Sequence, residues 1–322
     1  MVYFSVIITT HNRLKLLKRA IDSVLDQTIE CELIVVDDFS DDGTSEYLEN
    51  LSVKLYARNN FRLIYIRNAS NQGHSTSVNV GVAAAIGDWI KFLDDDDYLA
   101  PDCLEEMGKA IALRPEAAIC SCIAAQVDSN QVELSRTPVI GPGTAFYIPQ
   151  ADVHYGMLLE QVPFGTPAQV ACRRTAFLET GGWKSALDTN CDDIDSWIDT
   201  VKFGDAIFIN KCLAYRTIWL GAFNQRFSLT KRLNTNILMK QKIYTLVDKQ
   251  HNCYMPKFDD IKNYLRLHWL LIAIRHQNLL EIKNIFDFCI FSPKVLLILV
   301  NAFLLKRLGV NSYRVRKNIL IN

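Results

Sequence analysis

The sequence predicts an α/β fold in which helices cover a mostly parallel sheet, and three observations predict it. Short β-branched, apolar runs alternate with runs whose apolar residues recur at helical spacing throughout residues 4–93. The strand-like runs are apolar at nearly every position, as strands buried on both faces are. Aspartates follow two of these runs, at the strand ends where such sheets bind their ligands.

The first third of the chain supplies strands and helices in regular alternation. The first helix illustrates the helical pattern, because Leu14, Leu17 and Ile21 fall on one face. The expected elements are the strand Phe4–Thr9, the helix Arg13–Asp26, the strand Cys31–Val36, the helix Gly43–Leu51, the strand Leu63–Ile66, the helix Ser75–Ala85 and the strand Asp88–Leu93.

The rest of the chain divides into an irregular middle and a helical end. Residues 119–215 are richer in Pro and Gly, which predicts short strands and loops that wrap the ligand crevice. After about Gly221 the pattern becomes helical, with helices expected over Ser228–Val247 and Asp259–His276. We therefore predict an α/β domain at 1–220 and a C-terminal α-helical extension at 221–322.

The last expected helix, Glu281–Leu308, contains the apolar run Val295–Leu305. This run is shorter than the roughly 20 apolar residues that a membrane-spanning helix needs. An apolar helix with a basic flank is typical of an interfacial anchor on an anionic membrane surface, and a helix buried against protein is the alternative. The basic residues that follow the run are Lys306, Arg307, Arg314, Arg316 and Lys317.

Composition and charge exclude several classes of protein. The 35 Lys and Arg residues balance 35 Asp and Glu, so the formal net charge is zero and a nucleic-acid partner is disfavoured. Nine scattered cysteines, without a CxxC pair, disfavour a disulfide framework or a structural zinc site. Cys120 and Cys122 are expected to be buried, reduced thiols. The N-terminus lacks the basic region and cleavage site of a signal peptide, which favours the cytoplasm.

The strongest chemical signal is the run of four aspartates, Asp94 to Asp97, at the end of a predicted strand. Adjacent carboxylates repel one another, so a cation is expected to neutralise them. Ligands that offer only oxygen point to Mg²⁺ or Mn²⁺ and leave coordination positions for substrate phosphates. The alternative is a solvated acidic turn before the predicted helix Asp102–Leu113.

Two further acidic pairs are candidates for the functional site. Asp37 and Asp38 follow the second strand, where carboxylates accept hydrogen bonds from ribose hydroxyls or a base. No GxGxxG follows the first strand and no GxxxxGK[ST] occurs anywhere, which disfavours Rossmann oxidoreductases and P-loop enzymes. The second pair, Asp192 and Asp193, is either catalytic or an N-terminal cap of the helix Ile194–Phe203.

In this order and spacing, these motifs resemble family 2 glycosyltransferases of the GT-A fold. The resemblance is close over roughly the first 115 residues, resumes at Phe177 and fades after Arg216. It implies a Rossmann-like mixed sheet and makes 1–220 a catalytic domain. The motifs that carry it are Ser5–Arg13, Val35–Asp38, Asn71–Ile90, Phe92–Pro101, Phe177–Trp183 and Cys191–Trp197.

The resemblance also implies the roles of individual residues. Asp96 is the expected ligand of Mn²⁺ or Mg²⁺, and Asp193 is the expected general base, within a pair that is Glu-Asp in relatives. Many relatives carry Arg where this chain has Val78, so contact with the donor diphosphate falls to Arg13 or Arg216. The residues expected to bind the nucleotide-sugar donor are Thr9, Arg13, Asp38, Asn71, Asp94 and Asp95, with Asp38 facing the base.

The implied activity is inverting transfer of a hexosyl or N-acetylhexosaminyl group from a nucleotide-diphosphate sugar, with a UDP-sugar expected. The expected acceptor is a saccharide hydroxyl, on a lipid-linked saccharide at the inner face of the membrane, in cell-surface polysaccharide biosynthesis. Two alternatives share the fold. A sugar-nucleotide pyrophosphorylase would carry a Gly-rich loop after the first strand, where this chain has Thr10–Arg13. A non-catalytic nucleotide-sugar or glycan-binding module would lack the base.

Overall fold

The computed structural model forms two compact units, each described by itself. The α/β unit consists of Met1–Gln150, Pro163–Leu220 and Arg316–Asn322, and the helical unit of Ala151–Val162 and Gly221–Val315. The structure describes residues 2–57, 61–139, 141–162, 164–187, 191–219, 227–286 and 317–319. The apolar run Val295–Leu305 and the basic residues from Lys306 to Arg316 lie outside these ranges.

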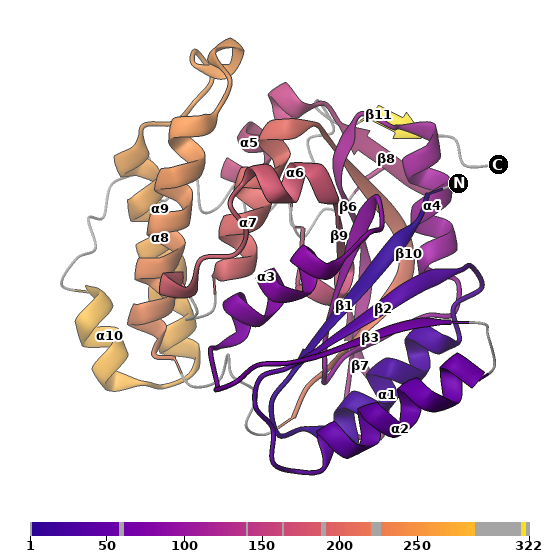
Figure 1. Cartoon of the computed structure of the whole chain (residues 1–322). Helices are drawn as coiled ribbons and strands as arrows, with labels where there is room; N and C mark the ends of the chain where they lie inside the picture. The colour runs from indigo at the N-terminus through magenta and orange to yellow at the C-terminus, as the bar shows by residue number, and fades with distance from the viewer. Residues whose placement is uncertain are drawn as a thin grey trace. The chain divides into compact units, whose positions relative to one another are not determined.

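A mixed sheet forms the centre of the α/β unit (Figure 1). Its parallel half follows the spatial order β3-β2-β1-β4, and β9 joins this half to β6 with antiparallel pairing. The predicted α/β class with a mixed sheet is thereby confirmed. The strands of this part are β1 (Phe4–Thr10), β2 (Cys31–Asp37), β3 (Arg62–Arg67), β4 (Trp89–Asp94), β6 (Ala117–Val127) and β9 (Val170–Arg173).

The remaining strands extend the sheet beyond β6. The sheet continues β6-β10-β8-β11, while β5 pairs with β10 and β7 pairs with β6. These strands are β5 (Tyr98–Leu99), β7 (Glu133–Arg136), β8 (Ala145–Ile148), β10 (Asp205–Thr217) and β11 (Lys317–Ile319).

Helices cover both faces of the sheet (Figure 1). On one face, Phe4 and Val6 of β1 share a core with apolar residues of α1 and α4. On the other face α3 lies so close that a Cβ at Gly81 would sit 2.6 Å from the Ile7 side chain. The helices are α1 (Leu14–Leu25), α2 (Thr44–Ala57), α3 (His74–Ala84), α4 (Cys103–Leu113), α6 (Arg174–Glu179) and α7 (Asp192–Thr200).

The irregular middle was only partly predicted. The expected short strands are present, but β10 is a strand of 13 residues, which corrects the expectation of short strands only. Its pairing with β6 shifts register between Ile209 and Cys212 and again before Ala214, so its sequence lacks continuous alternation. The 3-10 helices η1 (Pro167–Gln169), η2 (Ser185–Leu187) and η3 (Val201–Phe203) connect the elements here. Cys120 and Cys122 in β6 are buried free thiols, as expected.

The helical unit is built from four α-helices within its described residues. Lys240 of α8 donates to the carbonyls of Met157 and Leu158 at 2.7 and 2.9 Å and so caps the end of α5. Within the described part of the chain, every helix is too short or too polar to cross a membrane. The helices are α5 (Gln150–Leu158), α8 (Leu229–Leu246), α9 (Phe258–Arg275) and α10 (Leu279–Phe286), with the 3-10 turn η5 (Lys249–His251) between α8 and α9.

Candidate active site at the carboxyl ends of the parallel strands

The register of the parallel strands sets the position of the site. Thr9 of β1 pairs with Val36 of β2 on one side and with Asp94 of β4 on the other. These strands therefore end at the same edge of the sheet, where the turns that follow them carry polar side chains. Thr9, which was predicted to line the donor pocket, is buried here with 7% of its surface exposed.

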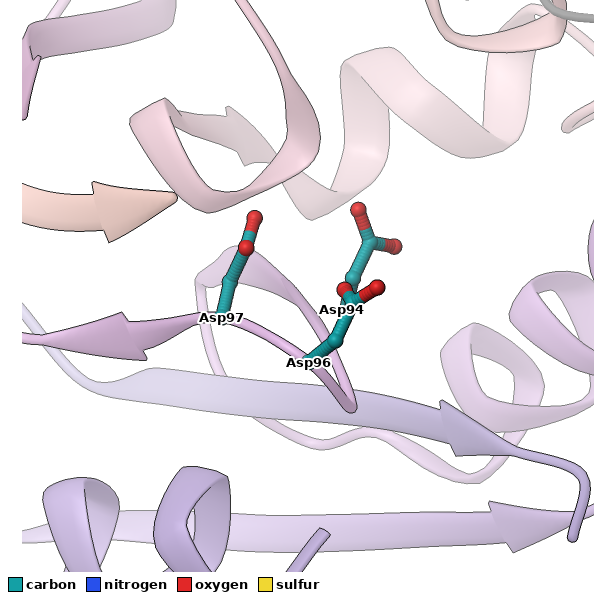
Figure 2. Close-up of side chains that lie close together, drawn as sticks. All are labelled: Asp94, Asp96 and Asp97. Atoms are coloured by element: carbon teal, nitrogen blue, oxygen red, sulfur yellow. The ribbon is translucent and has the colours of Figure 1, made fainter. Parts of the chain in front are cut away.

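Three of the four consecutive aspartates converge. Carboxylate oxygens of Asp94, Asp96 and Asp97 lie within 4.8 Å of one another, and Figure 2 shows the three side chains on the same side of the ribbon. Burial and the neighbouring carboxylates raise the pKa of Asp96 and of Asp97. The sequence singled out Asp96 as the metal ligand. The structure adds Asp97 and Asp94 as candidates, and this all-oxygen donor set fits Mg²⁺ or Mn²⁺.

Side chains at the end of β1 and at the start of α1 hold the carboxylate of Asp95, the remaining aspartate of the turn. Thr10 Oγ1 donates to it at 2.8 Å and Arg13 Nη1 at 2.9 Å, while the same guanidinium lies 3.5 Å from Asp96. Burial raises the pKa of Asp95 to about 6 in spite of the Arg13 charge. Arg13 therefore ties the start of α1 to the acidic turn.

The segment after β10 also contacts this turn. Trp219 Nε1 donates to Asp96 Oδ2 at 2.9 Å, and its ring lies 5.3 Å beneath the Arg13 guanidinium. Arg19 donates to Thr217 Oγ1 at 2.6 Å and to the Asp96 carbonyl at 2.5 Å. Neither periodicity nor a motif marks Trp219 or Arg19 in the sequence, because both residues reach the site only through folding.

Asp38 and Asn71 shape the turn that begins α3. The Asp38 carboxylate accepts hydrogen bonds from the backbone N–H groups of Gln72 and Gly73, both at 2.8 Å. Asn71 is exposed, and its side-chain oxygen accepts from Gly73 N–H at 3.2 Å. Gly73 has a φ of +88°, a conformation that other residues adopt only with strain. These contacts fix the start of α3.

His74, the first residue of α3, joins the two acidic regions. Its Nε2 lies 3.3 Å from Asp94 Oδ1 and its Nδ1 lies 3.5 Å from Asp192 Oδ2. Burial acts to lower the pKa of His74, but the hydrogen bonds to both carboxylates raise this pKa well above its ordinary value. Sequence reasoning missed His74. Its only sequence signal is its position directly after the Asn71–Gly73 motif.

The two carboxylates at the start of α7 have different surroundings. Asp192 is buried and accepts from Ser75 Oγ at 3.0 Å, and although burial opposes ionisation, its contacts with His74 and Ser75 lower its pKa. Asp193 is only partly buried by surface area, and its Oδ1 accepts from Ile194 N–H at 2.7 Å. Burial and the Asp192 charge raise the pKa of Asp193 to about 7.

Aromatic packing supports this half of the site. Trp183 stacks on Phe92 of β4 with ring centroids 5.5 Å apart, and only 3% of its surface is exposed. Asn79 of α3 exchanges two hydrogen bonds of 2.8 Å with the Trp183 backbone. The loop before α7 is therefore held against α3 and β4.

Comparison with known proteins gives the family. The model of glycosyl transferase family 2 matches residues 5–181. A glycosyltransferase of Haemophilus influenzae is 29% identical over 184 residues, which are 57% of this chain and 57% of that protein. The GalNAc(5)-diNAcBac-PP-undecaprenol β-1,3-glucosyltransferase of Campylobacter jejuni is 37% identical over 105 residues, 32% of either chain. The match thus spans 57% of the first relative and 32% of the second.

Solved structures show the same fold. TarS 1-349 of S. aureus in complex with UDP-GlcNAc is 18% identical with a TM-score of 0.57, and the match covers 93% of this chain and 79% of that TarS fragment. The mannosyltransferase PcManGT of Pyrobaculum calidifontis, in complex with GDP-Man and Mn²⁺, is 16% identical with a TM-score of 0.55, covering 96% of this chain and 88% of that one. The family match covers more than half of the sequence. The chain therefore belongs to glycosyl transferase family 2, and its α/β unit has the GT-A fold.

Proposed function

We propose that the chain is an inverting glycosyltransferase that moves a sugar from a nucleotide-diphosphate sugar to a hydroxyl of a saccharide acceptor. The proposed donor is a UDP-sugar. The observation that carries this proposal is the pairing of two acidic groups in one site. One is the acidic turn Asp94–Asp97, and the other is Asp193, whose pKa is raised to about 7. A metal-assisted leaving group and a separate base are what a single displacement at a sugar carbon requires.

The acidic turn is the proposed donor side. Asp94, Asp96 and Asp97 would hold Mn²⁺ or Mg²⁺, which when bound stabilises the negative charge that develops on the leaving diphosphate. Related structures bind UDP-GlcNAc and GDP-Man with Mn²⁺, which supports a donor of this class. The proposed donor-binding residues remain Thr9, Arg13, Asp38, Asn71, Asp94 and Asp95.

Asp193 is the proposed base. The acceptor hydroxyl oxygen forms a bond to the anomeric carbon while the bond from that carbon to the diphosphate breaks on the opposite face. Asp193 takes the hydroxyl proton, and the nucleoside diphosphate leaves. A carboxylate with a pKa near 7 is close to the optimum for general base catalysis at neutral pH. Asp192, in contrast, already accepts a hydrogen bond from Ser75 and contacts His74.

A panel of nucleotide sugars tests the proposed donor class. The full chain should release a nucleoside diphosphate from at least one UDP-sugar in the presence of Mn²⁺, and EDTA should abolish the release. Asp193→Asn should reduce transfer at least about a hundredfold while it leaves donor binding intact. Asp22→Asn, on the exposed side of α1, is the matched control and should be unchanged. Full activity of Asp193→Asn would refute the assignment of the base.

A lipid-linked acceptor at the inner face of the membrane is the finer proposal, within cell-surface polysaccharide biosynthesis. The Campylobacter jejuni relative is named for a substrate joined through pyrophosphate to undecaprenol, which supports an acceptor of this kind. The apolar run Val295–Leu305 with its basic flank supports peripheral contact with an anionic membrane. The full chain should co-sediment with anionic vesicles and less with neutral ones, and equal recovery without vesicles would overturn the membrane proposal.

A further inference from the structure

His74 occupies a position between the donor and acceptor halves of the proposed site. It is the only basic residue of α3, and it contacts Asp94 at the end of β4 through one ring nitrogen and Asp192 at the start of α7 through the other. Its ring packs edge-on against Trp183, with centroids 5.2 Å apart. The consecutive elements α3 and β4 and the distant helix α7 therefore meet at one imidazole.

Hydrogen bonds on either side of His74 hold its imidazole in place. The Asp38 carboxylate holds the backbone on the N-terminal side of His74, and Asn79 holds the Trp183 backbone one turn further along the helix. Ser75, the next residue, donates to the same Asp192 oxygen at 3.0 Å. The imidazole is thus set by its own helix and by the loop that carries Trp183.

We propose that His74 is a positioning residue that ties the donor-side carboxylate Asp94 to the acceptor-side pair Asp192 and Asp193. Without a group between them, the Asp94 and Asp192 carboxylates repel each other. Because Asp193 follows Asp192 directly, fixing Asp192 also fixes the base relative to the donor sugar. This inference rests on the proposed transferase function.

The contact with Asp94 is compatible with donor or metal binding. His74 faces Oδ1 of Asp94, and a carboxylate has a second oxygen that can accept another partner. About 30% of the Asp94 side chain is exposed, compared with 10% of the Asp192 side chain. His74 therefore orients Asp94 from one side and leaves its other side open to a ligand.

Two amide substitutions separate the two contacts. In His74→Asn the side-chain amide lies near the position of Nδ1, so the contact with Asp192 is kept and the contact with Asp94 is lost. In His74→Gln the amide reaches the position of Nε2, so the contact with Asp94 is kept and that with Asp192 is lost. We expect His74→Asn to raise the donor KM on the order of tenfold, and His74→Gln to lower kcat to a similar extent with little change in donor KM.

A double-mutant cycle links His74 to Asp192 without using activity. His74→Ala, Asp192→Asn and the double variant are compared by urea unfolding, and their effects should be non-additive because the two residues are in contact. His268→Asn, at an exposed position of α9, is the matched control for the kinetics and should behave as wild type. If His74→Ala does not fold, the two amide variants still decide the kinetic question.

The outcomes separate this inference from the proposed function. An active wild type whose Asn and Gln variants change kcat and KM in the same way, or not at all, would overturn the positioning role. Additive unfolding energies would also overturn it. If the wild type transfers no sugar from any donor, the proposed function fails, and the unfolding cycle alone then reports whether His74 bridges the two carboxylates.

Discussion

At the scale of single residues, two adjacent aspartates in α7 have opposite protonation behaviour. His74 and Ser75 favour the ionised form of Asp192, and the Asp192 charge together with burial favours the protonated form of Asp193. The sequence left open whether these residues act chemically or cap the helix. Their different surroundings give Asp193 the properties of a base and Asp192 those of its support.

The pH dependence of transfer follows from the raised pKa of Asp193. Burial, and then the charges of Asp192 and Asp94, raise this pKa, while the Ile194 N–H and the His74 charge lower it, with a result of about 7. Only the ionised carboxylate accepts a proton, so kcat/KM should rise about tenfold per pH unit below this value and level off above it. Initial rates between pH 5 and 9 measure the profile, and a flat profile between pH 5 and 7 would contradict the assignment.

The same shift predicts an effect on stability. In the folded chain Asp193 keeps its proton up to about pH 7, while the unfolded chain releases it near pH 3.9, as model peptides do. Because the folded state binds more protons between these values, stability is lost as the pH rises through this window. Asp193→Asn should therefore raise Tm by a few degrees above pH 7.

The difference in Tm between Asp193→Asn and the wild type should shrink as the pH falls. It should disappear below about pH 4, where Asp193 is protonated in the folded and the unfolded chain. Thermal unfolding at pH 8, 6 and 4 checks it, with Asp22→Asn as the control. A variant that is less stable than the wild type at pH 8 would count against the raised pKa.

Some site residues were predictable from the sequence and others were not. Thr9, Asp38 and Asp94 lie at or directly after the ends of largely apolar strands, and the parallel register brings such strand ends together. His74 and Trp219 had no such signal, because their partners come from elements more than 15 residues away and depend on tertiary packing. Asp97 was not predicted as a metal ligand, because the sequence alone does not show which of four adjacent carboxylates point in the same direction.

At the scale of elements, the backbone is closely packed where α3 leads into β4. A Cβ on Gly87 would lie 2.5 Å from Ser5 Oγ and 2.6 Å from Ser5 N, closer than atoms can approach. Gly87 N–H also donates to Ser5 Oγ at 2.8 Å, and the Ser5 hydroxyl donates to the buried Glu32 carboxylate. The start of β1 and the start of β4 are therefore locked together at this point.

A pair of Gly→Ala variants tests this packing. Gly87→Ala should lower the unfolding free energy by about 2 kcal/mol or more, because the new methyl group displaces the β1 backbone. Gly108→Ala in α4 meets only the Phe4 side chain at 3.6 Å and should gain about 0.5–1 kcal/mol from helix propensity. Urea unfolding compares the two, and equal effects would show that the close contact at Gly87 is unimportant.

The elements that the sequence predicted share one property, a regular pattern of burial. β1 and β2 are buried at every position, and α1 buries one stripe, so their sequences show the expected periodicity. The helix α5 and the long strand β10 escaped prediction. The former lacks a clear apolar stripe, and register shifts break the alternation of the latter.

At the scale of the whole molecule, the α/β unit contains every predicted site residue. The acidic turn, α3 and the start of α7 all belong to it, while the described helices of the other unit pack on one another. The prediction of a catalytic domain at 1–220 stays a prediction. The compact units differ from it mainly because Ala151–Val162 groups with the helical unit.

The central claim is inverting displacement at one sugar carbon, and the anomeric configuration of the product tests it without an acceptor. Many UDP-sugars carry an α-linked sugar, and water can replace the acceptor in slow hydrolysis. Proton NMR in the first minutes, before the free sugar mutarotates, identifies the anomer released by the wild type with Mn²⁺. We predict that the β-anomer appears first and that Asp193→Asn releases neither anomer. Initial release of the α-anomer would contradict the claim.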